Sequence, residues 1–213
     1  MLNYETIYRH YENCYEKHGD NNKGVDWPNP EDARVRYKIM LDVINFDARS
    51  DNSANKTVLD LGCGLAHLYE YISSNNIDVS YTGMDISKVF VDRCKNKYPD
   101  IRFINKDLLE EDFDEKFDYV IMNGVFTEKL QMSYEDMWKF FTTLIMRAFE
   151  ICDRGIAFNV MSKDVDWERD DLFHVPHSDL SSFIVKNLSR NYIMRSDYGL
   201  YEYTVYVFKE PNR

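Results

Sequence analysis

The sequence predicts an α/β fold with a doubly wound, mostly parallel sheet of seven strands that ends in an antiparallel hairpin. Two observations lead to this prediction. Apolar runs of strand length alternate with segments of helical period from Thr57 to Ser189. The last two strand-like runs, 192–196 and 201–209, are separated by a few residues around Gly199. Because a parallel pairing needs a long crossover, these two runs are expected to form the hairpin.

The other elements follow from local patterns along the chain. Short apolar runs predict five parallel strands, at 57–61, 79–84, 101–104, 117–122 and 155–161. The clearest helix spans Ser133 to Cys152, because its apolar residues recur at helical spacing. Shorter helices are expected at 65–72, 87–98 and 178–189, and Pro99 ends the second of them.

Residues 1–50 precede the first strand and are predicted to form a helical extension. Its segment from Glu31 to Phe46 carries apolar residues on one helical face. The polar run from Arg49 to Lys56 reads as a linker into the first strand. We therefore expect two parts, the extension at 1–50, acting as a lid, and a single α/β domain at 51–213.

The composition of the chain limits the kinds of partner that it is expected to bind. The formal charge of −11 opposes nonspecific binding to nucleic acid, which requires clustered lysine and arginine. No apolar run approaches the ~20 residues of a membrane span. The four cysteines show no metal-ligand spacing, and the chain begins without a basic-then-apolar signal segment. We expect a cytoplasmic protein without nucleic-acid or membrane partners, and the sequence leaves its oligomeric state open.

A glycine-rich loop follows the first predicted strand. The segment from Asp60 to Ala66 reads D-L-G-C-G-L-A and leads into a helix. Glycines at 62 and 64 allow close approach of a ligand to the backbone, and the helix start offers free N–H groups. The dinucleotide fingerprint requires a small residue where this chain has His67, so NAD fits poorly. Asp60 would repel a pyrophosphate but suits a ligand with an amino group and a sulfonium.

The D-x-G-x-G-x-A pattern resembles the first motif of the class I S-adenosylmethionine-dependent methyltransferases, with Ala66 in the place often held by a third glycine. The resemblance covers roughly Thr57 to Lys209, and the C-terminal hairpin agrees with it. It implies a Rossmann-like fold, a methyltransferase enzyme and S-adenosylmethionine as the cofactor. Because a fold does not settle chemistry, two alternatives stay open: a noncatalytic cofactor-binding partner subunit, and a transferase of the same fold with another donor.

The resemblance also implies a set of cofactor-binding residues. Asp85, twenty-one positions after Gly64, is expected to bind the ribose hydroxyls, and Asp107 to lie near the adenine amino group. Each carboxylate has a simpler interpretation, as a helix-start residue and a solvated loop residue respectively. Asn123 would face the methyl donor, unless it only forms a turn. The full expected set is Asp60, Gly62, Gly64, Leu65, Asp85, Ile86, Asp107, Leu108, Asn123 and Arg36, the last for the methionine carboxylate.

The acceptor is expected to be a small polar metabolite or sugar, methylated on oxygen, because no added recognition domain or basic stripe is present. His174 and His177 follow the fifth strand and are candidates for the general base, although both suit surface or capping roles. Tyr11, Trp27 and Arg34 of the extension are expected to contact the acceptor. No metal is predicted, because the acidic residues after the fifth strand are scattered along a polar loop.

Overall fold

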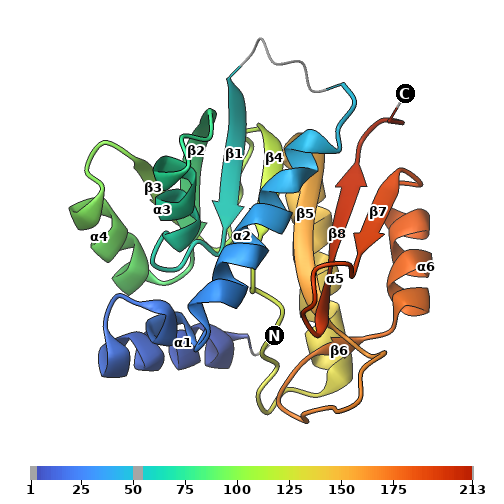
Figure 1. Cartoon of the computed structure of the whole chain (residues 1–213), viewed down its shortest axis with the longest axis horizontal. Helices are drawn as coiled ribbons and strands as arrows, with labels where there is room; N and C mark the ends of the chain where they lie inside the picture. The colour runs from blue at the N-terminus through green and yellow to red at the C-terminus, as the bar shows by residue number, and fades with distance from the viewer. Residues whose placement is uncertain (1–3, 50–54, 213) are drawn as a thin grey trace.

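The computed structural model describes residues 4–49 and 55–212, and these form helices packed on both faces of one sheet (Figure 1). The strands are β1 (Lys56–Leu61), β2 (Val79–Asp85), β3 (Arg102–Asn105), β4 (Phe117–Met122), β5 (Cys152–Ser162), β6 (His174–Val175), β7 (Tyr192–Arg195) and β8 (Glu202–Phe208). The α-helices are α1 (Glu5–His18), α2 (Pro30–Asn45), α3 (His67–Ser74), α4 (Lys88–Lys97), α5 (Tyr134–Glu150) and α6 (His177–Asn187), and η1 (Asn22–Val25) is a short 3₁₀ helix.

The main path of the sheet runs in the order β3-β2-β1-β4-β5-β8-β7. The first five of these strands pair in parallel, whereas β8 is antiparallel to both β5 and β7. The predicted doubly wound sheet and its hairpin are confirmed, with the two-residue β6 as an unpredicted addition beside β5. The strand order reverses at β1, which lies between β2 and β4. Ligands of open α/β sheets bind at such a reversal, outside the carboxyl ends of the strands.

The apolar residues of the strands pack into two cores, one on each face of the sheet. On one face Val58 and Tyr119 pack with α2, α3 and α4. On the other face Leu59 and Val120 pack with α5 and α6. This division follows from the period of two in a strand, which points neighbouring residues to opposite faces. Both faces of the parallel strands are therefore covered, as their near-continuous apolar sequences require.

The extension divides into two structurally different pieces. Helix α2 crosses one face of the sheet (Figure 1) and buries six residues, including Tyr37, Met40 and Val43. Helix α1 buries only Ile7 and, together with η1, lies near the ends of the strands. Of the expected linker, residues 50–54 lie outside the described residues, and Lys56 already belongs to β1. Among the helices of the described ranges, none has the length and apolar character needed to span a bilayer.

Candidate active site

A cavity lies where β1, β2 and β4 end, at the reversal of strand order. The glycine loop after β1, the ends of β2 and β4, and the loop after β3 line it, and α1, η1 and Trp27 cover it. Eleven of the residues singled out from the sequence line this cavity: Tyr11, Trp27, Asp60, Gly62, Gly64, Leu65, Asp85, Ile86, Asp107, Leu108 and Asn123. Arg34, Arg36, His174 and His177 do not contribute to the lining.

The glycine loop is held tightly against its neighbours. Gly62 has φ of 80° and Gly64 has φ of 51°, values that glycine adopts without steric cost. The N–H groups of Gly62 and Cys63 both donate to the Met84 carbonyl, at 2.8 and 3.1 Å. A Cβ atom at Gly62 would lie 2.6 Å from the Val125 side chain, so a larger residue there would push the post-β4 segment away. The loop thus brings its backbone to the cavity wall in one fixed shape.

Asp85, the last residue of β2, orients the glycine loop as well as lining the cavity. One carboxylate oxygen accepts from the Gly64 N–H at 2.8 Å, and the other accepts from the Ser87 N–H at 2.8 Å. Burial raises the pKa of Asp85 to about 6, although these backbone hydrogen bonds oppose the rise. Each carboxylate oxygen keeps acceptor capacity for a hydroxyl of a ligand. Asp85 therefore combines a structural role at the helix start with a place in the lining of the cavity.

Asp60 is a second buried carboxylate of the cavity. Its side chain is only 2 % exposed and accepts one hydrogen bond, from the Tyr81 hydroxyl at 2.7 Å. Burial raises the pKa of Asp60 to about 7, and the nearby negative charge of Asp85 adds to the rise. A buried carboxylate is costly unless an opposite charge compensates it. Asp60 is therefore suited to a cationic group of the ligand, such as an amino group.

Asp107 contacts Tyr4, the first residue that the structure describes. The Tyr4 hydroxyl donates to Asp107 at 2.5 Å, and the Tyr4 ring stacks on Phe140 with centroids 5.0 Å apart. Burial and this hydrogen bond to a carboxylate raise the pKa of the Tyr4 phenol. The second Asp107 oxygen accepts from the Leu109 N–H at 2.9 Å. The carboxylate expected near an adenine amino group is thus shared with Tyr4, which the sequence did not single out.

Asn123 follows β4 and carries an unsatisfied polar atom. Its Oδ1 is the one buried side-chain oxygen or nitrogen of the described residues that has no hydrogen-bond partner. Native structures contain few such atoms, because leaving a buried acceptor unpaired costs about 1–3 kcal/mol. Since Asn123 lines the cavity, a donor group of a bound ligand would satisfy this oxygen.

Gly124, the next residue, lies against the Trp27 ring. It has φ of 77°, and a Cβ atom there would collide with the Trp27 ring. The Gly124 N–H donates to Asn159 at 2.8 Å, and Asn159 in turn donates to Glu202 at 2.9 Å. The Gly124 carbonyl faces the Tyr11 hydroxyl at 3.4 Å. This end of the cavity is therefore built from Tyr11, Trp27 and the Gly124 backbone.

Side-chain contacts fasten the segment of α1 and η1 across α3 and α4. Glu12 accepts from the Ser87 hydroxyl at 2.5 Å. Asp20 lies 3.1 Å from His67, 3.1 Å from Arg93 and 3.2 Å from Lys97, and His67 and Lys97 lower its pKa against the effect of burial. The segment is held mainly by polar contacts at its ends rather than by a large apolar core. The histidine that replaces the dinucleotide glycine thus helps to fix the cover of the cavity.

The two loop histidines lie away from the cavity. His174 is buried in β6, where its Nδ1 lies 2.7 Å from the Ser162 carbonyl and its Nε2 accepts from the Arg169 N–H at 3.3 Å. Both ring nitrogens therefore serve the backbone, which leaves no free lone pair to take a proton from an acceptor. His177 lies 2.9 Å from Asp164 and stacks on Tyr203 with centroids 4.0 Å apart. These contacts favour the structural interpretation of both residues over the predicted role as a base.

The two arginines of α2 also lie outside the lining. Arg36 donates from Nε to Glu202 at 2.8 Å, and its guanidinium lies 5.0 Å from the centre of the Trp27 ring. Since Glu202 is 2 % exposed, this ion pair fixes Arg36 behind Trp27 instead of offering it to a methionine carboxylate. Arg34 is exposed to solvent. Arg36 thus positions a wall of the cavity, a role that its sequence did not indicate.

Acidic residues lie near Tyr11 but outside the residues that line the cavity. Glu128, in the segment after β4, is 8 % exposed and has no side-chain hydrogen bond or ion pair to the described residues. Burial raises its pKa to about 7, and the negative charges of Asp26 and Asp171 add to the rise. Burial and the charge of Glu128 also raise the pKa of the Tyr11 phenol. No local pattern in the sequence marks Glu128, because its neighbours Asp26 and Asp171 are distant in the chain.

Comparison with known proteins finds methyltransferases with similar sequences. A sequence model described as a methyltransferase domain matches residues 58–145, which include the glycine loop, Asp85, Asp107 and Asn123. A protein of Mycobacterium tuberculosis (strain ATCC 25618 / H37Rv), named for methyltransferase activity, is 27% identical over 157 residues. This match spans 72% of the present chain and 93% of that protein.

Solved structures share the whole fold at lower sequence identity. Magnesium protoporphyrin IX methyltransferase from Synechocystis PCC 6803, crystallised with S-adenosylmethionine, has a TM-score of 0.66 and 20% identity, with 99% of each chain covered. The 1,6-didemethyltoxoflavin-N1-methyltransferase of Burkholderia thailandensis, crystallised with 1,6-didemethyltoxoflavin and S-adenosylhomocysteine, has a TM-score of 0.63 and 15% identity. That match covers 97% of the present chain and 89% of the other. At these identities the likeness concerns the fold.

Proposed function

Because the chain is a class I S-adenosylmethionine-dependent methyltransferase, we propose that it methylates an oxygen atom of a small polar metabolite or sugar. The observation that carries the proposal is the cavity at the reversal of strand order. It combines a tight glycine loop, two buried carboxylates and a partnerless Asn123 oxygen with a separate end built from Tyr11, Trp27 and the Gly124 backbone. The first set of groups suits the cofactor, and the second suits a polar acceptor.

The residues of the cavity fit S-adenosylmethionine. Asp85 would hold the ribose hydroxyls, and Asp107 with the Leu108 backbone would bind the adenine edge after Tyr4 yields its hydrogen bond. Asp60 would pair with the positively charged amino group of the methionine portion, since no cation of the described residues pairs with Asp60. A donor on the same portion would satisfy the Asn123 oxygen. The cofactor is thus expected to lie across the glycine loop.

The bound cofactor supplies an electrophilic methyl group on a sulfonium, so the chain needs little catalytic machinery. Tyr11, Trp27 and the Gly124 backbone would align the acceptor and exclude water at the donor end. The carboxylates of Glu128 and Asp26 act on Tyr11 through their charge but lie outside the lining of the cavity, and they would draw the proton of an acceptor hydroxyl toward this end. An acidic environment also opposes anionic polymers, in agreement with the net charge of −11.

The acceptor class can be tested with S-adenosylmethionine that carries a deuterated methyl group. The purified protein is incubated with panels of small hydroxyl compounds, small amines, total RNA and total protein, and products are detected by mass. We expect the deuterated methyl on small hydroxyl compounds. Labelling of amines alone would contradict methylation on oxygen, and labelling of macromolecules alone would contradict a small acceptor. Asp92→Ala, an exposed change on α4, serves as the matched active control.

Cofactor binding is expected to weaken as the pH falls below about 7. Burial raises the pKa of Asp60 to about 7 and that of Asp85 to about 6. The carboxylate form of each group is the one that binds, so protonation at lower pH removes an acceptor or a compensating charge. Each group lowers the affinity by up to about tenfold per pH unit below its pKa. Calorimetry with S-adenosylhomocysteine from about pH 8 to pH 5 measures the effect.

Two single variants separate the contributions of these carboxyl groups. In Asp85→Asn the pH dependence near 6 is expected to disappear, and in Asp60→Asn the dependence near 7 is expected to disappear. An affinity of the unaltered protein that stays constant over the whole range would show that neither carboxylate contacts the cofactor.

A further inference from the structure

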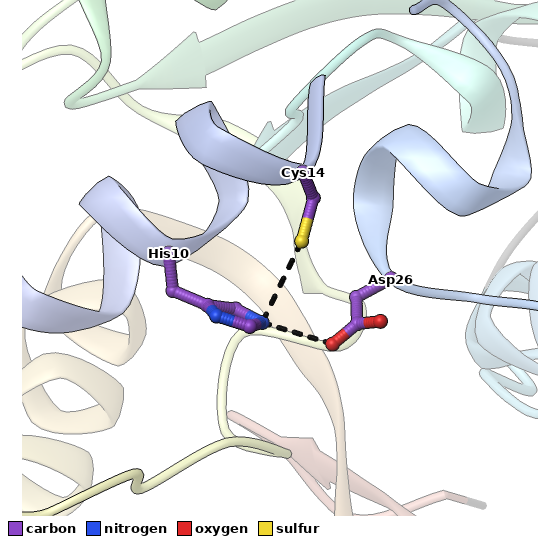
Figure 2. Close-up of side chains that lie close together, drawn as sticks. All are labelled: His10, Cys14 and Asp26. Carbon is purple, nitrogen blue, oxygen red and sulfur yellow. Dashed lines mark hydrogen bonds and ion pairs between the residues drawn. The ribbon is translucent and has the colours of Figure 1, made fainter. Parts of the chain in front are cut away.

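A cluster of three different ligand types lies where α1 meets the end of η1. Figure 2 shows His10 and Cys14 on one side of α1, with Asp26 approaching from the residue after η1. His10 Nε2 lies 2.9 Å from an Asp26 oxygen and 3.7 Å from Cys14 Sγ. All three ligand atoms lie within 4.8 Å of one another. The three side chains are partly exposed, so an ion from solvent can reach them.

The backbone presents these side chains together for simple geometric reasons. His10 and Cys14 are four residues apart on an α-helix, so their side chains lie on the same face. Asp26 has φ of 56°, and its N–H donates to the Asn22 and Lys23 carbonyls, which fixes its backbone in the left-handed region. Asparagine and aspartate tolerate that region better than most residues do. The position of the carboxylate is therefore set by the end of η1.

The donor set matches Zn²⁺ in chemistry and comes close to it in spacing. Zinc in proteins binds imidazole nitrogen, thiolate sulfur and carboxylate oxygen, usually with tetrahedral geometry. From the usual zinc–ligand bond lengths, the ligand atoms of such a site lie about 3.3–3.8 Å apart. The Cys14–His10 separation of 3.7 Å falls within this range, and the His10–Asp26 separation of 2.9 Å needs to open by a few tenths of an ångström. Side-chain rotations supply such a shift.

A second observation points to a cation in the same place. Glu128 is 8 % exposed, has no hydrogen-bond or ion-pair partner among the described residues, and experiences repulsion from Asp26. The main charge that opposes this repulsion is that of Arg169. Buried carboxylates are normally paired or coordinate metals. A divalent cation beside Asp26 would compensate both carboxylates.

We propose that His10, Cys14 and Asp26 bind a zinc ion whose fourth coordination position is open. Sites with three protein ligands keep a position for water or for an oxygen of a substrate. Tyr11 lies between His10 and Cys14 in the chain, and its hydroxyl faces the Gly124 carbonyl at the acceptor end of the cavity. A water molecule from solvent would take the open position, because the three ligands lie outside the residues that line the cavity. The ion would also join α1 to η1 and so stabilise the cover of the cavity.

The proposal departs from the sequence-based prediction of no metal. That prediction considered Asn123 after the fourth strand and the carboxylates after the fifth strand, whereas the present ligands come from the extension. The i, i+4 spacing of His10 and Cys14 was visible in the sequence, but the third ligand was not. Asp26 joins them only because η1 folds back against α1.

The test is metal binding to the metal-free full-length protein in the absence of cofactor and acceptor. Zinc is titrated by calorimetry, and cobalt(II) is titrated by absorption spectroscopy, where a thiolate ligand produces a charge-transfer band in the near ultraviolet. We expect one zinc ion per chain with micromolar or tighter affinity, and a cobalt spectrum of a tetrahedral site with a thiolate ligand. Because neither readout uses methyl transfer, failure of the proposed function leaves this result interpretable.

Substitutions of the three proposed ligands test which side chains bind the zinc ion. Cys14→Ser is expected to abolish the charge-transfer band, and Cys14→Ser, His10→Ala and Asp26→Asn are each expected to weaken zinc binding at least tenfold. His18→Ala removes an exposed histidine of the same helix and is the matched control, with unchanged binding expected. Circular dichroism confirms that each variant is folded. Absence of zinc binding, or binding that all three ligand variants leave unchanged, would overturn the proposal.

Discussion

A chain that begins at Pro28 is expected to fold and to lose methyl transfer by a factor of about 100 or more. This truncation removes α1, η1 and Trp27. It also removes Tyr4, Tyr8 and Tyr11, which line the cavity. Helix α1 buries only Ile7, whereas α2, which stays, buries six residues against the sheet. Without the cover, water reaches the donor end and the acceptor loses one wall. Turnover, circular dichroism and calorimetry with S-adenosylhomocysteine measure the three effects.

A second truncation provides the contrast. A chain that begins at Ser50 also lacks α2, so the sheet face that packs against Tyr37, Met40 and Val43 becomes exposed. We expect this chain to aggregate, because a large exposed apolar face favours association. The point variant Trp27→Ala is expected to lower turnover while the fold survives, since Trp27 is partly exposed. A soluble Pro28 chain that turns over at the full-length rate would show that α1 and η1 are not a lid.

Replacing Asp85 with alanine is expected to weaken S-adenosylhomocysteine binding by about 1.5–3 kcal/mol, or roughly 10- to 150-fold. The substitution removes the acceptors of the ribose hydroxyls. It also releases the Gly64 and Ser87 N–H groups, both of which Asp85 holds at 2.8 Å, so the glycine loop loosens. Dissociation constants from calorimetry measure the loss, and thermal unfolding shows whether the domain stays folded.

Asp92→Ala is the matched control for this variant. It removes the same charge from α4, but its side chain is 52% exposed and pairs with Lys88 away from the cavity. Its affinity for S-adenosylhomocysteine is expected to equal that of the unaltered protein. If a folded Asp85→Ala protein also bound as tightly, Asp85 would only mark the start of α4.

The sheet and the cofactor loop were predictable because their signals are local. Alternating strand and helix patterns give the parallel strands, and the short connection at Gly199 gives the β7–β8 hairpin. The pair of glycines after β1 gives the loop, whose positive φ values confirm the reason for glycine at Gly62 and Gly64. In each case the residues that determine the structure lie within one turn or one strand of each other.

The side chains that were harder to predict depend on distant partners. His67 was interpreted only as a departure from the dinucleotide pattern, but it contacts Asp20, 47 positions earlier. Arg36 was expected near the cofactor, but it pairs with Glu202, 166 positions later. His174 lies in a polar loop of the sequence, and pairing of β6 with β5 turns its ring toward the Ser162 carbonyl. Proximity in sequence did not indicate the direction of these side chains.

Calorimetry of the full-length protein with two ligands tests whether the cavity is a site for S-adenosylmethionine. S-adenosylhomocysteine is expected to bind at one site per chain with a dissociation constant of about 1–100 μM, and NADH is expected to give no saturable heat. The glycine loop, Asp60 and His67 all favour the first ligand over the second. Saturable binding of NADH without binding of S-adenosylhomocysteine would contradict the account.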